Sequence, residues 1–230
     1  MIHGVMGRLR TCAPWRDLPE RYGPWQTVYH RFNKMRKNGL IDRLLERLRA
    51  WLNAERLIDA ELWCIDGTVI RAARAAGGAV SLAKKVADEP EDHALGRSRG
   101  GFGTKVHLVR DGHGVPLAVT LTPGQRHEST QFEAVLGKVR LRGPRCRPVK
   151  LTGDKGYSYG RIWRWLARHG IKAVIPRRKD QRPDDNRVRF DREAYRRRST
   201  VERCIGWLKE CRAVATRFDK LAVNDQATIH

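Results

Sequence analysis

The sequence has few acidic residues: 25 Asp and Glu stand against 47 Lys and Arg, which gives a formal net charge of +22. Because the basic residues are spread along the whole chain, the excess predicts a surface for a polyanion rather than a detachable tail. Nucleic acid is the leading candidate partner. On charge alone, a ribosomal-type RNA binder and a protein of anionic membrane surfaces stay open as alternatives.

Cysteines are also scarce, and long hydrophobic runs are missing. The five cysteines are odd in number, far apart and form no C-x-x-C pair, so neither a disulfide framework nor a zinc ribbon is indicated. No apolar run approaches the roughly 20 residues that cross a bilayer, which excludes an integral membrane protein. The N-terminus lacks the apolar core and cleavage site of a signal peptide. We therefore expect a reduced, cytoplasmic compartment.

The chain nevertheless contains enough apolar residues for a core, and its first 57 residues are predicted to be helical. Val28, Tyr29, Phe32 and Met35 recur at helical spacing before a stop at Gly39. A second apolar stripe follows, made of Leu40, Ile41, Leu44, Leu45, Leu48, Trp51 and Leu52. Two helices with a glycine break and a basic face resemble a helix-turn-helix. A solvated face on a small helical bundle is the alternative.

From about residue 58 the pattern predicts strands and helices in alternation. The predicted elements are a strand at 63–66, a mobile loop at 71–103, a hairpin of strands 104–109 and 116–122, a helix at 132–139, a strand at 148–152, a helix at 159–168, a strand at 171–175, a charged loop at 177–192 and a long helix at 192–214. This order matches a ribonuclease-H-like mixed sheet. A generic α/β domain is the alternative. We divide the chain into domains at 1–57 and 58–230.

Three acids stand at informative places in this order. Asp66 ends the first predicted strand, Asp154 follows the fourth, and Glu202 lies in the last helix. The first and fourth strands are neighbours in a ribonuclease-H-like sheet, and the last helix crosses beside them. Three neighbouring carboxylates repel one another unless cations lie between them. Oxygen ligands suit Mg²⁺ or Mn²⁺, and two such ions can clamp the attacking and leaving oxygens of a phosphodiester.

Taken singly, each acid also has an ordinary structural interpretation. Asp66 followed by Gly67 fits a hairpin turn, and Asp154 fits a strand-to-helix loop. Glu202 has the i, i+4 spacing for an ion pair with Arg198. We favour the joint interpretation because all three acids fall at the expected positions of one fold.

The last helix carries a two-sided pattern. Tyr195, Arg198, Glu202 and Lys209 are spaced by 3, 4 and 7 residues and fall on one stripe. An adjoining stripe able to bury against the sheet consists of Val201, Cys204, Ile205 and Leu208. The helix therefore presents a carboxylate flanked by two cations while its other side packs.

This Y-x2-R-x3-E-x6-K pattern resembles the signature of bacterial insertion-sequence transposases of the DDE class, and more specifically the insertion sequence five family. The resemblance continues through motifs at residues 10–19, 22–28, 95–101, 104–107, 121–128 and 153–157. It implies that Asp66, Asp154 and Glu202 are the catalytic metal ligands of two Mg²⁺ or Mn²⁺ ions. It also implies that Arg198 and Lys209 contact DNA phosphates near the scissile bond.

The resemblance further implies a nucleoid-associated enzyme that binds the terminal inverted repeats of its element as a dimer. Such an enzyme cuts the 3′ end of each strand, and the freed 3′-hydroxyl then attacks target DNA. The expected DNA-binding residues, besides the two cations of the last helix, are Tyr195 as a support, Trp15, Arg16, Trp25 and Arg31 in the N-terminal helices, and Arg177, Arg178 and Arg187 in the charged loop. His127 and Lys105 belong to the motifs, and we expect them to be structural.

The chain begins close to the first motif and stops at His230, where relatives continue, so we expect a copy truncated at both ends. Two alternatives to an active transposase stay open. One is an inactive truncated copy that only binds DNA. The other is a ribonuclease-H-like nuclease without strand transfer, which a search for joined products would distinguish.

Overall fold

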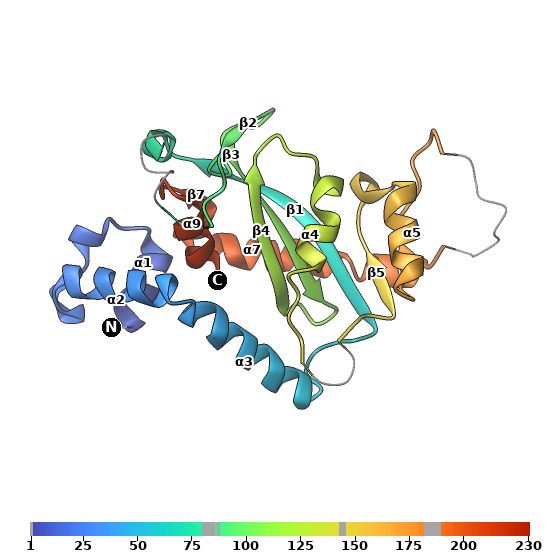
Figure 1. Cartoon of the computed structure of the whole chain (residues 1–230), viewed down its shortest axis with the longest axis horizontal. Helices are drawn as coiled ribbons and strands as arrows, with labels where there is room; N and C mark the ends of the chain where they lie inside the picture. Colours follow the sequence, from blue (N-terminus) through green and yellow to red (C-terminus); the bar gives the residue numbers. More distant parts are fainter. Residues whose placement is uncertain (1, 80–85, 87, 143–145, 182–189) are drawn as a thin grey trace.

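The computed structural model describes residues 2–79, 86, 88–142, 146–181 and 190–230. Helices α1 (Ile2–Thr11), α2 (Trp25–Lys37) and α3 (Leu40–Ala54) precede a mixed sheet that is flanked by further helices (Figure 1). The helical prediction for the first 57 residues is confirmed. Gly39 joins α2 to α3 at a φ of 61°, a backbone conformation that favours glycine. Within the described ranges, no helix is both long and apolar enough to cross a membrane.

The apolar stripe of α3 is only partly used for packing. Leu52 packs against the core of the sheet, and Ile41 and Leu45 are half-buried. The stripe members left exposed are Leu40, Leu44, Leu48 and Trp51. Four of the seven stripe residues are therefore not used for packing, and α3 reaches the core of the sheet through Leu52 near its C-terminal end.

The sheet contains β1 (Leu62–Ala72), β2 (Gly96–Ser98), β3 (Gly101–Asp111), β4 (Pro116–Pro123), β5 (Lys150–Thr152), β6 (Lys172–Val174) and β7 (Thr216–Arg217). Its order is β2-β3-β1-β5-β6, with β4 also on β3 and β7 on β1. Strands β1, β3 and β4 are antiparallel neighbours, whereas β5 and β6 run parallel to β1. This is the ribonuclease-H-like arrangement that the sequence predicts.

The loop predicted at 71–103 is wrong at both ends. Strand β1 continues to Ala72, a 3₁₀ helix follows at Arg74–Ala79, and β2 and β3 begin at Gly96 and Gly101. Tertiary pairing explains the difference, since β1 stays hydrogen-bonded to β3 as far as the pair Arg71 and Gly103. Residues 80–85 and 87 of this loop lie outside the described residues.

The remaining helices are α4 (Phe132–Leu136), α5 (Gly160–Arg168), α6 (Arg192–Arg196), α7 (Ser199–Glu210), α8 (Arg212–Ala215) and α9 (Ala222–Ile229). The single long helix predicted at 192–214 is therefore wrong. Cys211 leaves helical geometry with a ψ of 101°. This break turns the chain so that Val214 is buried and Thr216 pairs with Arg71 of β1.

Two apolar cores cover the two faces of the sheet. One lies beneath α4 and α5 and includes Ile65, Val109, Phe132, Leu151, Ile162 and Leu166. The other lies beneath α7, α8 and α9 and includes Ile70, Val106, Leu108, Cys204, Val214 and Ile229. Because side chains alternate along a strand, β1 contributes to both.

Buried charges join the N-terminal helices to the end of the chain. Arg8 of α1 is 7% exposed and lies 3.9 Å from Asp219. Arg217 is fully buried, lies 3.9 Å from Asp225 and donates to Thr104 Oγ1 at 2.7 Å. The Arg8 contact thus holds α1 against the segment between β7 and α9, and the Arg217 contacts hold β7 against α9 and β3.

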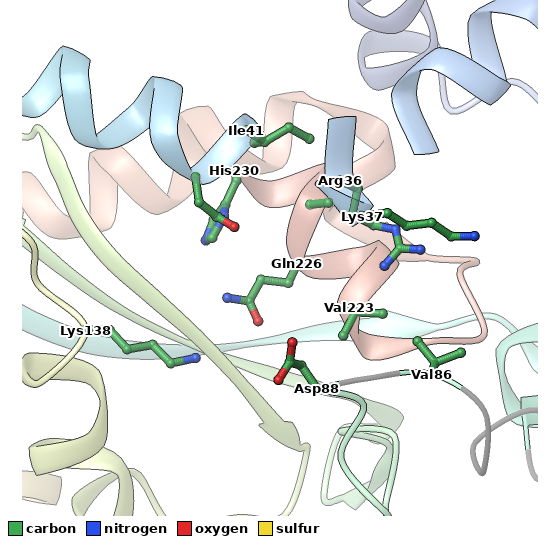
Figure 2. Close-up of a pocket in the computed structure, with 11 residues that line it drawn as sticks. Arg36, Lys37, Ile41, Val86, Asp88, Lys138, Val223, Gln226 and His230 are labelled. Carbon is green, nitrogen blue, oxygen red and sulfur yellow. The ribbon is translucent and has the colours of Figure 1, made fainter. Parts of the chain in front are cut away.

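A cavity of about 570 Å³ opens between the N-terminal helices and α9. Figure 2 shows side chains of both charges around it, among them Arg36, Lys138 and Asp88, together with the imidazole of His230. His230 Nδ1 lies 2.9 Å from the Asp42 carboxylate. The cavity is therefore a mixed-charge gap between two packed parts, and the acids expected for catalysis do not line it.

Candidate active site

The candidate active site lies at an open edge of β1. The last pair between β1 and β5 is Cys64 with Thr152, and Asp66 and Asp154 each follow two residues later. In the described part of the chain, this edge of β1 has no strand neighbour again until Arg71 pairs with β7. Asp66 and Asp154 therefore lie at the same level of the sheet, Asp66 within β1 and Asp154 just after the end of β5. Asp66 lies inside β1 and not at its end, so it forms no hairpin turn.

Asp66 is held from both sides. Its side chain is 15% exposed; Oδ1 accepts the Gly67 N–H at 2.9 Å, and Oδ2 lies 3.3 Å from Arg198 Nη1. Burial raises the pKa of Asp66 to about 6, and the nearby carboxylates of Glu128 and Asp154 act in the same direction. The Gly67 hydrogen bond and Arg198 oppose that rise.

Asp154 begins the short 3₁₀ helix at Lys155–Tyr157, where its Oδ1 accepts the Gly156 N–H at 2.8 Å. The strand-to-helix loop proposed as its ordinary interpretation is thus present. Tyr157 is fully buried beside it, and within the described residues its hydroxyl has no hydrogen-bond partner. Burial raises the pKa of Tyr157 well above its usual value, and the neighbouring carboxylates raise it further.

The signature of the last helix docks along β1. Arg198 Nη2 lies 3.3 Å from Glu202, so the i, i+4 ion pair exists, and the same guanidinium also reaches Asp66. The Glu202 side chain is 66% exposed. Lys209 Nζ donates to Thr68 Oγ1 at 2.8 Å, and the Tyr195 ring lies 5.8 Å from the Arg198 guanidinium carbon. The helix thus brings two cations to the strand that carries Asp66.

The chemistry of the donors fits a divalent cation, because Asp66 and Asp154 offer carboxylate oxygens beside the Tyr157 hydroxyl, which has no hydrogen-bond partner among the described residues. Across the ranges that the structure describes, no three His, Cys, Asp or Glu side chains are arranged to hold a metal. Arg198 links Asp66 to Glu202 instead. The described geometry is therefore that of a charge-paired acidic edge.

Sequence reasoning did not single out Glu128. This residue lies over Gly67, and Lys105 Nζ is 3.3 Å from its Oε1. Its neighbour His127 has a structural part, since its ring Nδ1 accepts the Ser129 N–H at 3.3 Å. The sequence signal that could have identified Glu128 was its place at the end of the motif at 121–128, directly after His127, to which we assigned a structural role.

The residues expected to read DNA from the N-terminal helices differ in exposure. Trp15 packs on Tyr29 and Phe32, with ring centroids 5.4 and 5.5 Å apart. Trp25 lies 5.8 Å beneath the guanidinium of Arg16. Trp15 therefore helps to hold the helices together. Arg16 and Arg31 are exposed.

The charged loop begins beside the candidate site. Arg177 stacks over Trp163 at 5.1 Å, and Arg178 stacks over Tyr159 at 4.3 Å. Arg178 Nε also donates to the Lys155 carbonyl at 3.2 Å. These contacts fix two basic side chains next to the loop of Asp154. Arg187 lies outside the described residues.

The strand order and the acidic edge place the chain in the ribonuclease-H-like class. Residues 59–229 match the family described as the transposase DDE domain, and residues 1–45 match a family described as transposases of the IS4/5 family. The chain therefore belongs to the transposase DDE domain family.

A protein of Burkholderia cepacia named as a transposase for insertion sequence element IS402 is 33% identical over 125 residues, which are 52% of this chain and 56% of that relative. The chain thus spans about half the length of this curated relative. Among solved structures, a chain of the simian T-cell lymphotropic virus intasome with PP2A regulatory subunit B56 gamma has a TM-score of 0.36, 14% identity and coverage of 66% of this chain and 40% of that one. The piggyBac transposase synaptic complex with hairpin DNA has a TM-score of 0.33, 17% identity and coverage of 57% and 27%.

Proposed function

We propose that this chain binds the terminal inverted repeats of its own insertion sequence, cuts their strands in a metal-dependent reaction and joins the freed 3′ ends to target DNA. One observation carries the proposal. The signature helix α7 meets β1 so that Arg198 contacts Asp66 and Glu202 at 3.3 Å each, while Asp154 leaves the neighbouring strand at the same level.

Asp66, Asp154 and Glu202 are the proposed holders of two Mg²⁺ or Mn²⁺ ions. Bound divalent cations supply activation of the attacking oxygen and neutralise charge on the phosphodiester. The chain itself supplies the positive charge that surrounds the site. Arg198, supported by the Tyr195 ring, and Lys209 hold the phosphate next to the scissile bond, because both cations already lie along β1.

The DNA surface is proposed to have two parts. The N-terminal domain, residues 1–57, reads the terminal repeats through its exposed Arg16 and Arg31, with Trp15 and Trp25 positioning them; the separate family match at 1–45 supports this division. The loop that begins at Arg177 grips the backbone next to Asp154, and we assign Arg178 and Arg187 to the same surface. Base contacts specify and phosphate contacts position. Because two ends of the element are cut together, the protein acts on DNA as a dimer. Its place of action is the nucleoid.

The test is cleavage of an end-labelled duplex taken from the DNA that flanks the reading frame, with Mg²⁺. Asp66→Asn, Asp154→Asn and Glu202→Gln should each lower cleavage by about 100-fold or more while duplex binding stays near the wild-type value, since losing one metal-site group costs at least tenfold. Glu210→Gln is the matched control, because Glu210 is exposed on the same helix.

Three results would contradict parts of the proposal. Cleavage without joined products would make the chain a nuclease. Duplex binding without any metal-dependent cleavage would make it a DNA-binding protein only. Wild-type cleavage by Glu202→Gln would remove Glu202 from the site and leave its pair with Arg198 as a surface ion pair.

A further inference from the structure

Glu128 is a half-buried carboxylate without an assigned role. It opens the short 3₁₀ helix Glu128–Gln131 between β4 and α4, and its side chain is 20% exposed. Its described ion-pair partner is Lys105 of β3, with Nζ 3.3 Å from Oε1, and the Lys105 side chain is 14% exposed. A pair this far from solvent positions both groups more firmly than a surface ion pair does.

Two glycines allow Glu128 to lie against the segments that carry Asp66 and Asp154. A Cβ at Gly67 would lie 2.7 Å from Glu128 Cγ, and a Cβ at Gly156 would lie 3.1 Å from Glu128 Oε2. The same point at Gly156 is 2.8 Å from Asp154 Oδ1. Any side chain at either glycine would displace a carboxylate. Glu128 therefore shares one small space with the segments that position Asp66 and Asp154.

The charges of this space favour a cation. The Glu128 carboxylate lies over Gly67, the residue after Asp66, and both Glu128 Oε2 and Asp154 Oδ1 lie within 3.1 Å of the position that a Cβ at Gly156 would take. Half-buried carboxylates that lie close together are costly unless positive charge lies between them. Lys105 supplies that charge for Glu128, and no such contact is described for Asp154.

We propose that Glu128 contributes a carboxylate to the divalent-cation site of Asp66 and Asp154, and that Lys105 holds this carboxylate in place until the cation enters. The inference rests on the metal-dependent function proposed above and deepens it. Lys105 then competes with the cation for the same oxygen, so the two residues have opposite effects on metal affinity.

Mn²⁺ binding to the full chain without DNA tests the assignment, measured by titration calorimetry and by the electron paramagnetic resonance signal of free Mn²⁺. Glu128→Gln keeps the shape of the side chain and removes its charge, so Mn²⁺ affinity should fall by about 10- to 100-fold. Glu133→Gln is the matched control, because Glu133 lies five residues further on and its side chain is 53% exposed. Equal melting temperatures in EDTA establish that both variants are folded.

Two further variants separate the possible failures. Lys105→Met should bind Mn²⁺ several-fold more tightly than the wild type, since the competing ammonium is gone; unchanged or weaker binding would overturn the role given to Lys105. If Asp66→Asn loses Mn²⁺ binding and Glu128→Gln does not, the inference on Glu128 is wrong and the proposed function stands. If Asp66→Asn also binds Mn²⁺ like the wild type, the metal site of the proposed function is wrong.

Discussion

Asp66→Asn should make the metal-free protein more stable above pH 6, although it should abolish function. The substitution keeps an oxygen that accepts the Gly67 N–H and removes the charge that burial disfavours. Because burial raises the pKa of Asp66 from 3.8 to about 6, the folded state binds this proton more tightly than the unfolded state does.

The size of the effect follows from that difference. Between about pH 4 and pH 6 the folded protein holds more protons than the unfolded chain, so stability falls as pH rises through this window. A pKa that moves from 3.8 to about 6 corresponds to about 3 kcal/mol. The stabilisation of Asp66→Asn over the wild type should therefore grow by up to about 3 kcal/mol from pH 4 to pH 7.5.

Urea unfolding in EDTA, followed by tryptophan fluorescence at several pH values, measures this difference. Asp17→Asn is the control, since Asp17 is exposed and belongs to the N-terminal region that precedes the first strand. Added Mn²⁺ should stabilise the wild type and leave Asp66→Asn unchanged. A difference in the free energy of unfolding that stays constant from pH 4 to pH 7.5 would refute the reasoning, because burial would then not disfavour the ionised form of Asp66.

Three further predictions concern DNA and packing. If about six phosphates are neutralised, log affinity should fall with log salt at a slope near −5 in fluorescence anisotropy, and a slope near −1 would assign most arginines a structural role. Arg177→Ala and Arg178→Ala should weaken terminal-repeat and random duplexes alike in the same assay; loss of the specific complex alone would mean that they read bases. Gly67→Ala puts a Cβ 2.7 Å from Glu128 Cγ, so it should lower the free energy of unfolding by about 1–3 kcal/mol and weaken Mn²⁺ binding. Wild-type values of both would show that Glu128 is not confined there.

The central strands were predictable because their signals are local. The turn around Gly112 and Gly114 and the alternating residues beside it indicate a hairpin, and β3 and β4 form it. The neighbouring position of Asp66 and Asp154 then follows from strand order alone, as the pair Cys64 and Thr152 shows. Local pattern and topology were sufficient for this part of the site.

Other features depend on contacts between distant residues and could not be predicted in this way. Helix α7 ends before Cys211, and the turn there leads to the pairing of Thr216 with β1, which no helical periodicity records. The partner of Glu128 is likewise 23 residues away on β3. A charge pattern along one helix suggests an ion pair within it, and the second contact of Arg198, with Asp66, appears only when helix and strand meet.

At Gly67 the strand β1 has no side chain, so an acid on one face of the sheet can approach an acid on the other face. Alternation along β1 puts Ile65 and Gly67 on the α4 face, whereas Asp66 faces α7 and Arg198. An acid on one face and an acid on the other would normally be separated by the strand itself. Without a side chain at position 67, Glu128 closes against the strand from the α4 face while Asp66 is held from the α7 face. The open edge of β1 thus takes acids from both faces, each held by one cation, which is why changing Lys105 and changing Arg198 should affect different carboxylates of one site.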